Sequence, residues 1–347
     1  MKKSADNFVR AFLFAFTQSL SAILKSSCIV TTTSFMKPAE IFINEYGRLR
    51  SGWRFVVFSL LFVFFSFLAA AIADFVFSGL AASIGLINVM SSAIGGFLSF
   101  AAAILVGWLC GKHLEALPFR ALGAWFTKSW LKDLTLGLLL GALSLALAVL
   151  IAVSFGGLSF DFNQTNESSA VRLTLLVSLI IFAAGAAFEE ALFRGYILQT
   201  FARANLAWLA IVLTSLFFAV AHLNNDNVTF LSTANTALAG IWFGIAYLKT
   251  RTLWFVFGLH LMWNWFQGAI FGIEVSGITA FTTAPLLKEI DAGPVWLTGE
   301  TYGIEGGIAC TIALLISIAL IWFLPILKPT VEMLALTNKE NPNSGLI

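Results

Sequence analysis

The sequence predicts an all-α, polytopic membrane protein built as a bundle of about eight transmembrane helices, and two observations lead to this fold class. Of the 347 residues, 59% are hydrophobic and only 11% are charged, and the mean hydropathy is +0.91. Soluble domains are less apolar and more highly charged. In addition, apolar windows of about twenty residues, the length that a helix needs to cross a bilayer, recur along the chain.

The apolar windows give the expected order of the membrane helices. Each window is long enough for one span, and no long linker interrupts the series. The spans are expected at residues 55–77, 89–110, 134–155, 173–199, 206–223, 229–248, 253–270 and 307–324.

Lysine and arginine are concentrated in alternate loops of this arrangement. Cytoplasmic loops of membrane proteins are enriched in these residues, so the positively charged side is expected to be cytoplasmic. The opposite loops carry only Arg172 and Lys288, whereas the cytoplasmic side carries Arg48, Arg50, Arg54, Lys112, Arg120, Lys128, Lys132, Arg203, Lys249, Arg251 and Lys328. Both termini should therefore lie in the cytoplasm.

The chain is expected to have three parts. Residues 1–35 form an N-terminal extension, in which Lys2 and Lys3 precede an apolar stretch as in a signal-peptide start or an amphipathic helix; Met36 is an alternative first residue. Residues 36–330 are the transmembrane domain, and residues 173–270 are its motif core. Residues 331–347 end in a polar run and are expected to be a disordered cytoplasmic tail.

Composition also excludes several kinds of partner and site. No basic block points to nucleic acid, and the abundant Phe and Trp fit surfaces that face lipid. Cys28, Cys110 and Cys310 are scattered and show no C-x-x-C spacing. The cysteines therefore indicate neither a disulfide framework nor a thiolate metal site.

The fourth expected span contains three charged residues, Glu189, Glu190 and Arg194. A charged group inside a bilayer costs about 2.5–3.5 kcal/mol on insertion scales, so such groups usually face a polar interior and mark a functional path. On a helix Glu190 lies beside Arg194, whereas Glu189 is rotated by about 100 degrees. A buried ion pair is expected for Glu190 and Arg194, and Glu189 is the candidate to act on water; structural pairing of all three is the alternative.

Histidines add to this set from two other spans. His222 ends the fifth span, while His260 and Asn264 lie on one face of the seventh. A lone histidine at the end of a span, such as His222, is more often an interfacial or hydrogen-bonded residue than a ligand. Placing these groups with the glutamates in one cavity avoids several separate desolvation penalties, so a shared site is expected.

Three motifs in this order, Glu189-Glu190-x-x-x-Arg194, Phe218-x-x-x-His222 and His260-x-x-x-Asn264, resemble the CPBP family of intramembrane proteases. This family includes the type II CAAX prenyl endopeptidases and the bacteriocin-processing (Abi) proteins. The motifs lie within residues 173–270, and the glycine-rich loop 293–307 is similar to that of bacterial members. The chain is therefore expected in the cytoplasmic (inner) membrane of a bacterium.

The resemblance implies a CAAX protease-like metalloendopeptidase that hydrolyses peptide bonds of membrane-associated protein or peptide substrates, in contact with membrane lipid. In such an enzyme Glu189 and His222 would activate a water, and His260 and Asn264 would stabilise the oxyanion. Glu190 and Arg194 complete the catalytic set. Glu189, His222 and His260 could hold a catalytic Zn²⁺ with an open position for water, although a metal-free glutamate mechanism uses the same residues.

Two other functions are compatible with an apolar bundle that contains polar groups. A transporter should show paired halves with broken helices, and the sequence lacks this symmetry. A non-catalytic membrane protein of immunity or assembly should have lost a motif residue, and every motif residue is present. Hydrolysis is therefore the preferred interpretation.

The expected spans leave one inconsistency. With straight helices at 1.5 Å per residue, Glu189 lies in the cytoplasmic third of the bilayer and His222 near its outer surface, about 15 Å apart in depth. A shared site therefore requires helices that are tilted, broken or shifted relative to these windows.

Overall fold

The structure of the chain is a computed structural model, and it describes residues 38–78, 87–163 and 168–337. The chain divides into two compact units, Met1–Phe42 and Ile43–Ile347. Of the first unit only the short helix α2 (Pro38–Phe42) is described, so the expected N-terminal extension, residues 1–35, lies outside the described residues. The second unit contains the membrane helices and all the candidate site residues.

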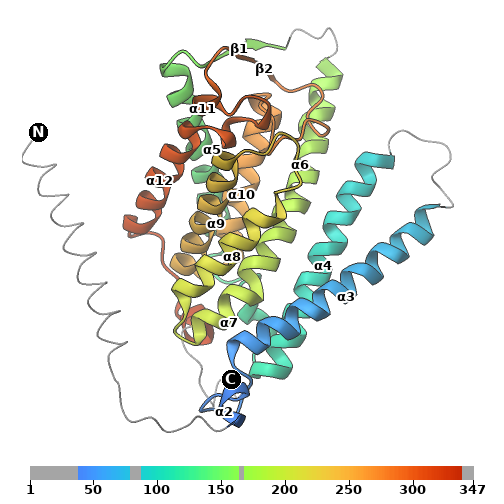
Figure 1. The fold of residues 1–347 in the computed structure, drawn as a ribbon, viewed down its shortest axis with the longest axis vertical. Helices are drawn as coiled ribbons and strands as arrows, with labels where there is room; N and C mark the ends of the chain where they lie inside the picture. Colours follow the sequence, from blue (N-terminus) through green and yellow to red (C-terminus); the bar gives the residue numbers. More distant parts are fainter. Residues whose placement is uncertain (1–37, 79–86, 164–167, 338–347) are drawn as a thin grey trace, which may run out of the picture. The chain divides into compact units, whose positions relative to one another are not determined.

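Every expected span forms a helix, which confirms the prediction of an all-α polytopic membrane protein. Among the described residues, five helical stretches are long and apolar enough to cross a membrane, and α8 and α12 are shorter apolar helices. In chain order the helices are α3 (Ser51–Ser78), α4 (Ile87–Glu115), α5 (Trp130–Ser154), α6 (Ser168–Glu190), α7 (Leu198–Arg203), α8 (Ala207–Ala221), α9 (Phe230–Thr250), α10 (Leu253–Trp265) and α12 (Ile308–Phe323), as Figure 1 shows.

Two of these helices continue through π-helical turns. The segment η2 (Ala191–Ile197) joins α6 to α7, so that Ser168–Arg203 is one helical stretch of 36 residues. The segment η3 (Phe266–Ile270) extends α10 in the same way. Since π-helical turns inside α-helices occur frequently at functional sites, both segments direct attention to the residues beside them.

Helices α5 and α10 approach each other closely because glycines line their contact. Gly137 and Gly141 lie one turn apart on α5, and a Cβ at either position would overlap the backbone carbonyl oxygen of Phe255 or Leu259 on α10. On α10, Gly258 faces the backbone of α5 at Leu134 and Leu138 in return. Small residues at this spacing let membrane helices pack backbone to backbone. This contact fixes the position of the helix that carries His260 and Asn264.

Short elements cover the end of the bundle that lies opposite α7 in Figure 1. Strand β1 (Leu158–Phe162) pairs antiparallel with β2 (Leu287–Asp291), with Leu158 opposite Asp291. Helix α11 (Val295–Thr298) and the 3₁₀ turns η4 (Glu300–Tyr302) and η5 (Ile304–Gly306) follow β2 and lead into α12. The sequence-based expectation did not include this cap, which brings residues 274–306 over the helix ends.

The expectation of a disordered tail at residues 331–347 is wrong for its first part. Residues Val331–Thr337 form helix α13, while residues 338–347 lie outside the described residues. Met333 and Leu336 of α13 are buried against Leu117 and Ala121. Apolar positions three residues apart on one helix face explain this docking, because burying them removes apolar surface from water.

Substitution of Gly137 should test the backbone contact between α5 and α10. Gly137→Ala places a methyl group where the Phe255 carbonyl lies, so the helices must separate, and overpacking of this kind costs about 1–3 kcal/mol. Gly95→Ala in α4 is the matched control, because a Cβ there meets no atom within 4 Å. Thermal unfolding in detergent should show a lower Tm for Gly137→Ala alone; equal values for both variants would contradict the contact.

Because of Glu289 in strand β2, we expect the stability of the folded protein to depend on pH. Burial, together with the carboxylates of Glu274 and Asp291, raises the pKa of Glu289 from an ordinary 4.5 to about 8. Between these values the folded protein holds a proton that the unfolded chain has lost, so this group lowers the stability as pH rises from 4.5 through 8. Glu289→Gln should therefore raise Tm relative to wild type at pH 9 and leave it unchanged at pH 4. The exposed Glu300→Gln should raise it at neither pH.

Candidate active site

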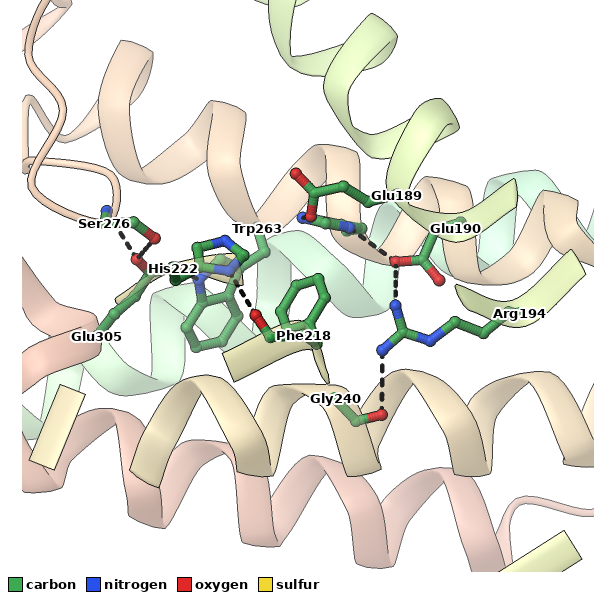
Figure 2. Close-up of polar contacts among 10 residues, drawn as sticks. Glu189, Glu190, Arg194, Phe218, His222, Gly240, Trp263, Ser276 and Glu305 are labelled. Carbon is green, nitrogen blue, oxygen red and sulfur yellow. Dashed lines mark hydrogen bonds and ion pairs between the residues drawn. The ribbon is translucent and has the colours of Figure 1, made fainter. Parts of the chain in front are cut away.

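The candidate residues come from four elements of the helical bundle, and the structure brings them together. Glu189 and Glu190 end α6, and Arg194 lies in the π-helical segment η2. His222 directly follows α8, and His260 and Asn264 lie on α10. Figure 2 shows the polar contacts among these elements.

Glu190 is the centre of a buried polar network. One of its carboxylate oxygens, Oε1, accepts from Arg194 Nη1 at 3.1 Å and from His260 Nδ1 at 2.8 Å. Arg194 in turn donates from Nη2 to the Gly240 carbonyl of α9 at 3.1 Å. Glu190 and Arg194 are 1% and 0% exposed, so the expected ion pair forms and is screened from water. The network ties η2, α9 and α10 to one carboxylate.

Aromatic rings pack against the Arg194 and His260 side chains of this network. The ring of Phe243 stacks on the imidazole of His260 with centroids 4.5 Å apart. The Arg194 guanidinium lies 5.0 Å from the ring centroids of both Phe218 and Phe243. Cations over aromatic faces are stabilised electrostatically, and more so when they are desolvated. The rotamers of Arg194 and His260 are therefore fixed by packing as well as by hydrogen bonds.

His222 is oriented by its own helix. Its Nδ1 lies 2.7 Å from the carbonyl oxygen of Phe218. Because a carbonyl oxygen only accepts hydrogen bonds, Nδ1 carries the proton, and Nε2 of the neutral ring is left with a lone pair. The Phe218 ring also packs against the imidazole at 4.7 Å between centroids. His222 can therefore present Nε2 to a water or another ligand in the cavity beside it.

Two cavities meet at the site. An inner cavity of about 50 Å³ is lined by polar groups that include Glu189, His260 and Glu305, and it has room for a few water molecules. An outer cleft of about 370 Å³ is lined mainly by apolar side chains, among them Ile181, Phe182, Phe188, Leu192, Phe193 and Phe281. Four residues line both cavities: Glu189, His222, Asn264 and Ser276.

The two glutamates have different surroundings. Glu189 is 26% exposed, and its Oε2 lies 3.9 Å from His260 Nε2 without a hydrogen-bond partner among the described residues. Glu190 and Arg194 line neither cavity. Glu189 therefore faces both cavities, whereas Glu190 and Arg194 bond to each other and hold His260 through Glu190.

The expected depth mismatch between Glu189 and His222 does not occur. Glu189 lies about four helical turns from the end of α7 at Arg203, and His222 lies about four turns from the start of α8 at Ala207. The helix from α6 to α7 ends later than the predicted window. Helix α8 has only 15 residues, about 22 Å, and so is shorter than a hydrocarbon layer of about 30 Å. Both side chains thus reach the same level.

The sequence alone did not predict that Glu305 lines the inner cavity. Glu305 accepts from Trp263 Nε1 at 3.0 Å and from both the backbone nitrogen and Oγ of Ser276, at 2.8 Å and 2.6 Å (Figure 2). Its position in a glycine-rich run just before the last span was the available signal. Only the folding of the 274–306 segment over the helix ends brings it to the site.

The candidate zinc ligands can be compared with what a metal requires. Ligand atoms at about 2.1 Å from one zinc ion, in tetrahedral geometry, lie roughly 3.4 Å apart. Glu189 Oε2 and His260 Nε2 are 3.9 Å apart. Within the described part of the chain, no three His, Cys, Asp or Glu side chains are grouped closely enough to hold a metal ion. No step of the chemistry is therefore assigned to a metal.

The sequence relationship agrees with this arrangement. Residues 171–266 match the family model of the type II CAAX prenyl endopeptidases, Rce1-like. The segment that carries the candidate residues is therefore similar to the CAAX protease family. The matched segment contains all six candidate residues and extends from the first turn of α6 to the end of α10. No curated protein and no solved structure matches the chain.

At the level of the family, the match supports a CAAX-type intramembrane protease, and it confirms the resemblance found in the three motifs. The match covers less than the whole bundle. Helices α3, α4 and α5 and the cap after residue 270 lie outside it.

The two neighbouring glutamates of this site, Glu189 and Glu190, should differ sharply in their effect on stability. Glu190→Gln leaves the buried Arg194 charge without its counter-ion, and removal of one partner of a buried pair costs about 3 kcal/mol or more. Glu189→Gln leaves no such charge and should cost less than about 1 kcal/mol. Thermal unfolding of both purified variants in detergent measures the difference. A Tm loss of similar size in both would contradict the separate roles.

Proposed function

We propose that the protein is an endopeptidase that hydrolyses peptide bonds of membrane-associated protein or peptide substrates, using a water activated by Glu189 and His222. The observation that carries this proposal is the position of these two side chains at the junction between a small polar cavity and a larger apolar cleft. Water fits the polar side and an apolar polypeptide segment fits the other. Hydrolysis requires both reactants at one place.

Activation of the water follows from the two side chains. His222 Nε2 accepts one hydrogen bond from the water and orients it, while the Glu189 carboxylate accepts its proton. The water oxygen then attacks the carbonyl carbon of the substrate. When the C–N bond of the resulting tetrahedral intermediate breaks, Glu189 returns the proton to the leaving amine, so that the carboxylate is regenerated.

Stabilisation of the oxyanion is assigned to α10. The Asn264 side chain lines both cavities, and its amide makes no hydrogen bond to the described residues. His260 lies deeper, held at Nδ1 by Glu190, and in its doubly protonated form donates from Nε2. Donors fixed in advance at a developing negative charge contribute several kcal/mol to catalysis, about 2.7–4 kcal/mol for one donor. Glu190 and Arg194 keep these donors in place.

The substrate class follows from the cleft. Apolar side chains from α6 and from the loop after residue 274 line it, and its volume of about 370 Å³ suits an extended peptide with large apolar side chains. Lipid surrounds the bundle, because many large hydrophobic side chains of α3 and α12 are exposed, such as Phe67 at 73% and Trp322 at 58%. A membrane-associated substrate can therefore reach the cleft from the bilayer.

The proposal also places the protein in the cytoplasmic membrane of a bacterium. Arg120, Lys132 and Arg203 lie beside the loops that the distribution of Lys and Arg assigns to the cytoplasm. The cap with β1 and β2 then lies on the outer side, and both ends of the chain lie on the cytoplasmic side.

Cleavage of a quenched fluorescent peptide library by detergent-purified protein tests the proposed function. Glu189→Gln and His222→Ala should each lower the rate about 100-fold or more, because removal of a general base commonly costs this much. Glu300→Gln and His113→Ala, which change an exposed glutamate and an exposed histidine, are the matched controls and should retain the rate.

Chelation during the same assay decides between a zinc-dependent and a metal-free enzyme. Loss of cleavage with a chelator and recovery with added Zn²⁺ would assign Glu189, His222 and His260 as ligands in the active form. Unchanged cleavage would assign the metal-free mechanism. If folded wild-type protein cleaved no peptide, or if the two active-site variants cleaved as fast as wild type, the proposed function would be wrong.

A further inference from the structure

Glu305 is the second carboxylate that lines the inner cavity, beside Glu189, and the hydrolytic mechanism does not use it. It lies in η5, directly before α12, and it is half-buried. Each of its two oxygens is occupied: Oε1 accepts from Trp263, and Oε2 accepts twice from Ser276. A side chain whose oxygens are filled by fixed protein donors is suited to hold structure rather than to exchange protons.

The group held by Glu305 is a tight turn at residues 275–278. Val275 and Ile278 form a β-bridge, and the two residues between them have positive φ, 51° for Ser276 and 80° for Gly277. The left-handed region is unfavourable for serine, so the surroundings must hold this conformation. The two hydrogen bonds from Ser276 to Glu305 act directly at that residue.

Hydrogen bonds also connect this turn to His222, the histidine that is proposed to orient the attacking water. Asn225 donates from Nδ2 to the Ser276 carbonyl at 3.0 Å, and its backbone nitrogen donates to the His222 carbonyl at 3.1 Å. On its other side, Glu305 is bonded to Trp263, the residue that precedes Asn264 on α10. A continuous path of hydrogen bonds therefore joins α10, Glu305, the turn and the end of α8.

Glu305 itself is rigidly supported. Asn235 of α9 donates from Nδ2 to its backbone carbonyl at 2.8 Å, and the Tyr302 carbonyl accepts from the Gly277 nitrogen at 2.9 Å. Gly303 has φ 86°, and a Cβ there would overlap the Glu274 carbonyl oxygen. The glycine-rich run thus lets the chain pass close enough to the turn for the short Glu305 side chain to reach it.

The turn forms part of the wall of the apolar cleft. Val275, Ser276 and Ile278 line the cleft, and Ser276 also lines the inner cavity together with Glu189 and His222. A shift of this turn would change the width of the cleft beside the reacting groups. It would leave the network of Glu190 and Arg194 untouched, because the hydrogen bonds of that network join Glu190, Arg194, His260 and Gly240 and do not involve the turn.

We propose that Glu305 is a substrate-positioning residue, which holds the 275–278 turn as a fixed wall of the substrate cleft next to Glu189 and His222. This inference rests on the proposed function for the meaning of the cleft. A carboxylate suits position 305 because its two oxygens accept hydrogen bonds from three donors. An amide at this position offers a single acceptor oxygen and turns an NH₂ group toward one of the donors.

Steady-state cleavage of the fastest peptide found in the quenched fluorescent library tests the role in substrate positioning. Glu305→Gln should raise KM about tenfold and change kcat by less than about threefold, because the cleft wall moves while the water-activating groups stay. Ser276→Ala removes only the Oγ contact and should raise KM by a smaller factor. Glu300→Gln, an exposed glutamate on the same loop, should change neither parameter. A lower kcat with unchanged KM in Glu305→Gln would overturn the proposal.

Hydrogen–deuterium exchange gives a second readout that does not depend on activity. Glu305→Gln should speed exchange in peptides that contain residues 275–278, because the Ser276 amide loses its acceptor, and Glu300→Gln should not. Unchanged exchange over the turn would overturn the proposal even if catalysis were impaired. If Glu305→Gln failed to fold, Ser276→Ala would carry both measurements. Absence of cleavage by the wild type would overturn the proposed function, while the exchange result would still decide whether Glu305 holds the turn.

Discussion

The structure of the site depends on one buried carboxylate, that of Glu190. Its Oε1 atom receives hydrogen bonds from Arg194 and from His260, and Arg194 extends the connection to the backbone of α9. A carboxylate in this position is costly unless it is paired and hydrogen-bonded. The same bonds that satisfy it also fix the direction of His260. The requirement to satisfy a buried charge is therefore what orders the groups that face the cavity.

Glycines at the helix contacts let the helices around this network pack closely against one another. Gly137 and Gly141 let α5 lie against the backbone of α10, and Gly240 of α9 lies against Ser215 of α8 while its carbonyl accepts from Arg194. Arg194 lies in the π-helical segment η2, which begins directly after Glu190. Without side chains at the glycine contacts, α8, α9 and α10 converge, and the polar groups of separate spans come within hydrogen-bond distance.

The proposed chemistry and the proposed substrate-binding surface meet at a boundary between two environments. Polar groups gather on the inner side, where Glu189 and His222 face a small cavity, and aromatic and aliphatic side chains line the outer cleft. The cap after α10 completes this boundary through Ser276, which Glu305 holds from the start of the last span. A protease that works on membrane-associated substrates needs this division, because water and an apolar polypeptide have to reach the same atoms from different sides.

The sequence by itself determined the membrane fold, the number and order of the helices, and the pairing of Glu190 with Arg194, because hydrophobic length and helical spacing are local properties of the chain. It also identified three motifs that lie within the segment matched by the family model. Only the tertiary structure decided that Glu189 and His222 lie at one depth, since that depends on where α7 ends and how short α8 is. It likewise decided that α13 docks on Leu117 and that Glu305 joins the site. These features arise from contacts between segments distant in sequence, which no local pattern of residues encodes.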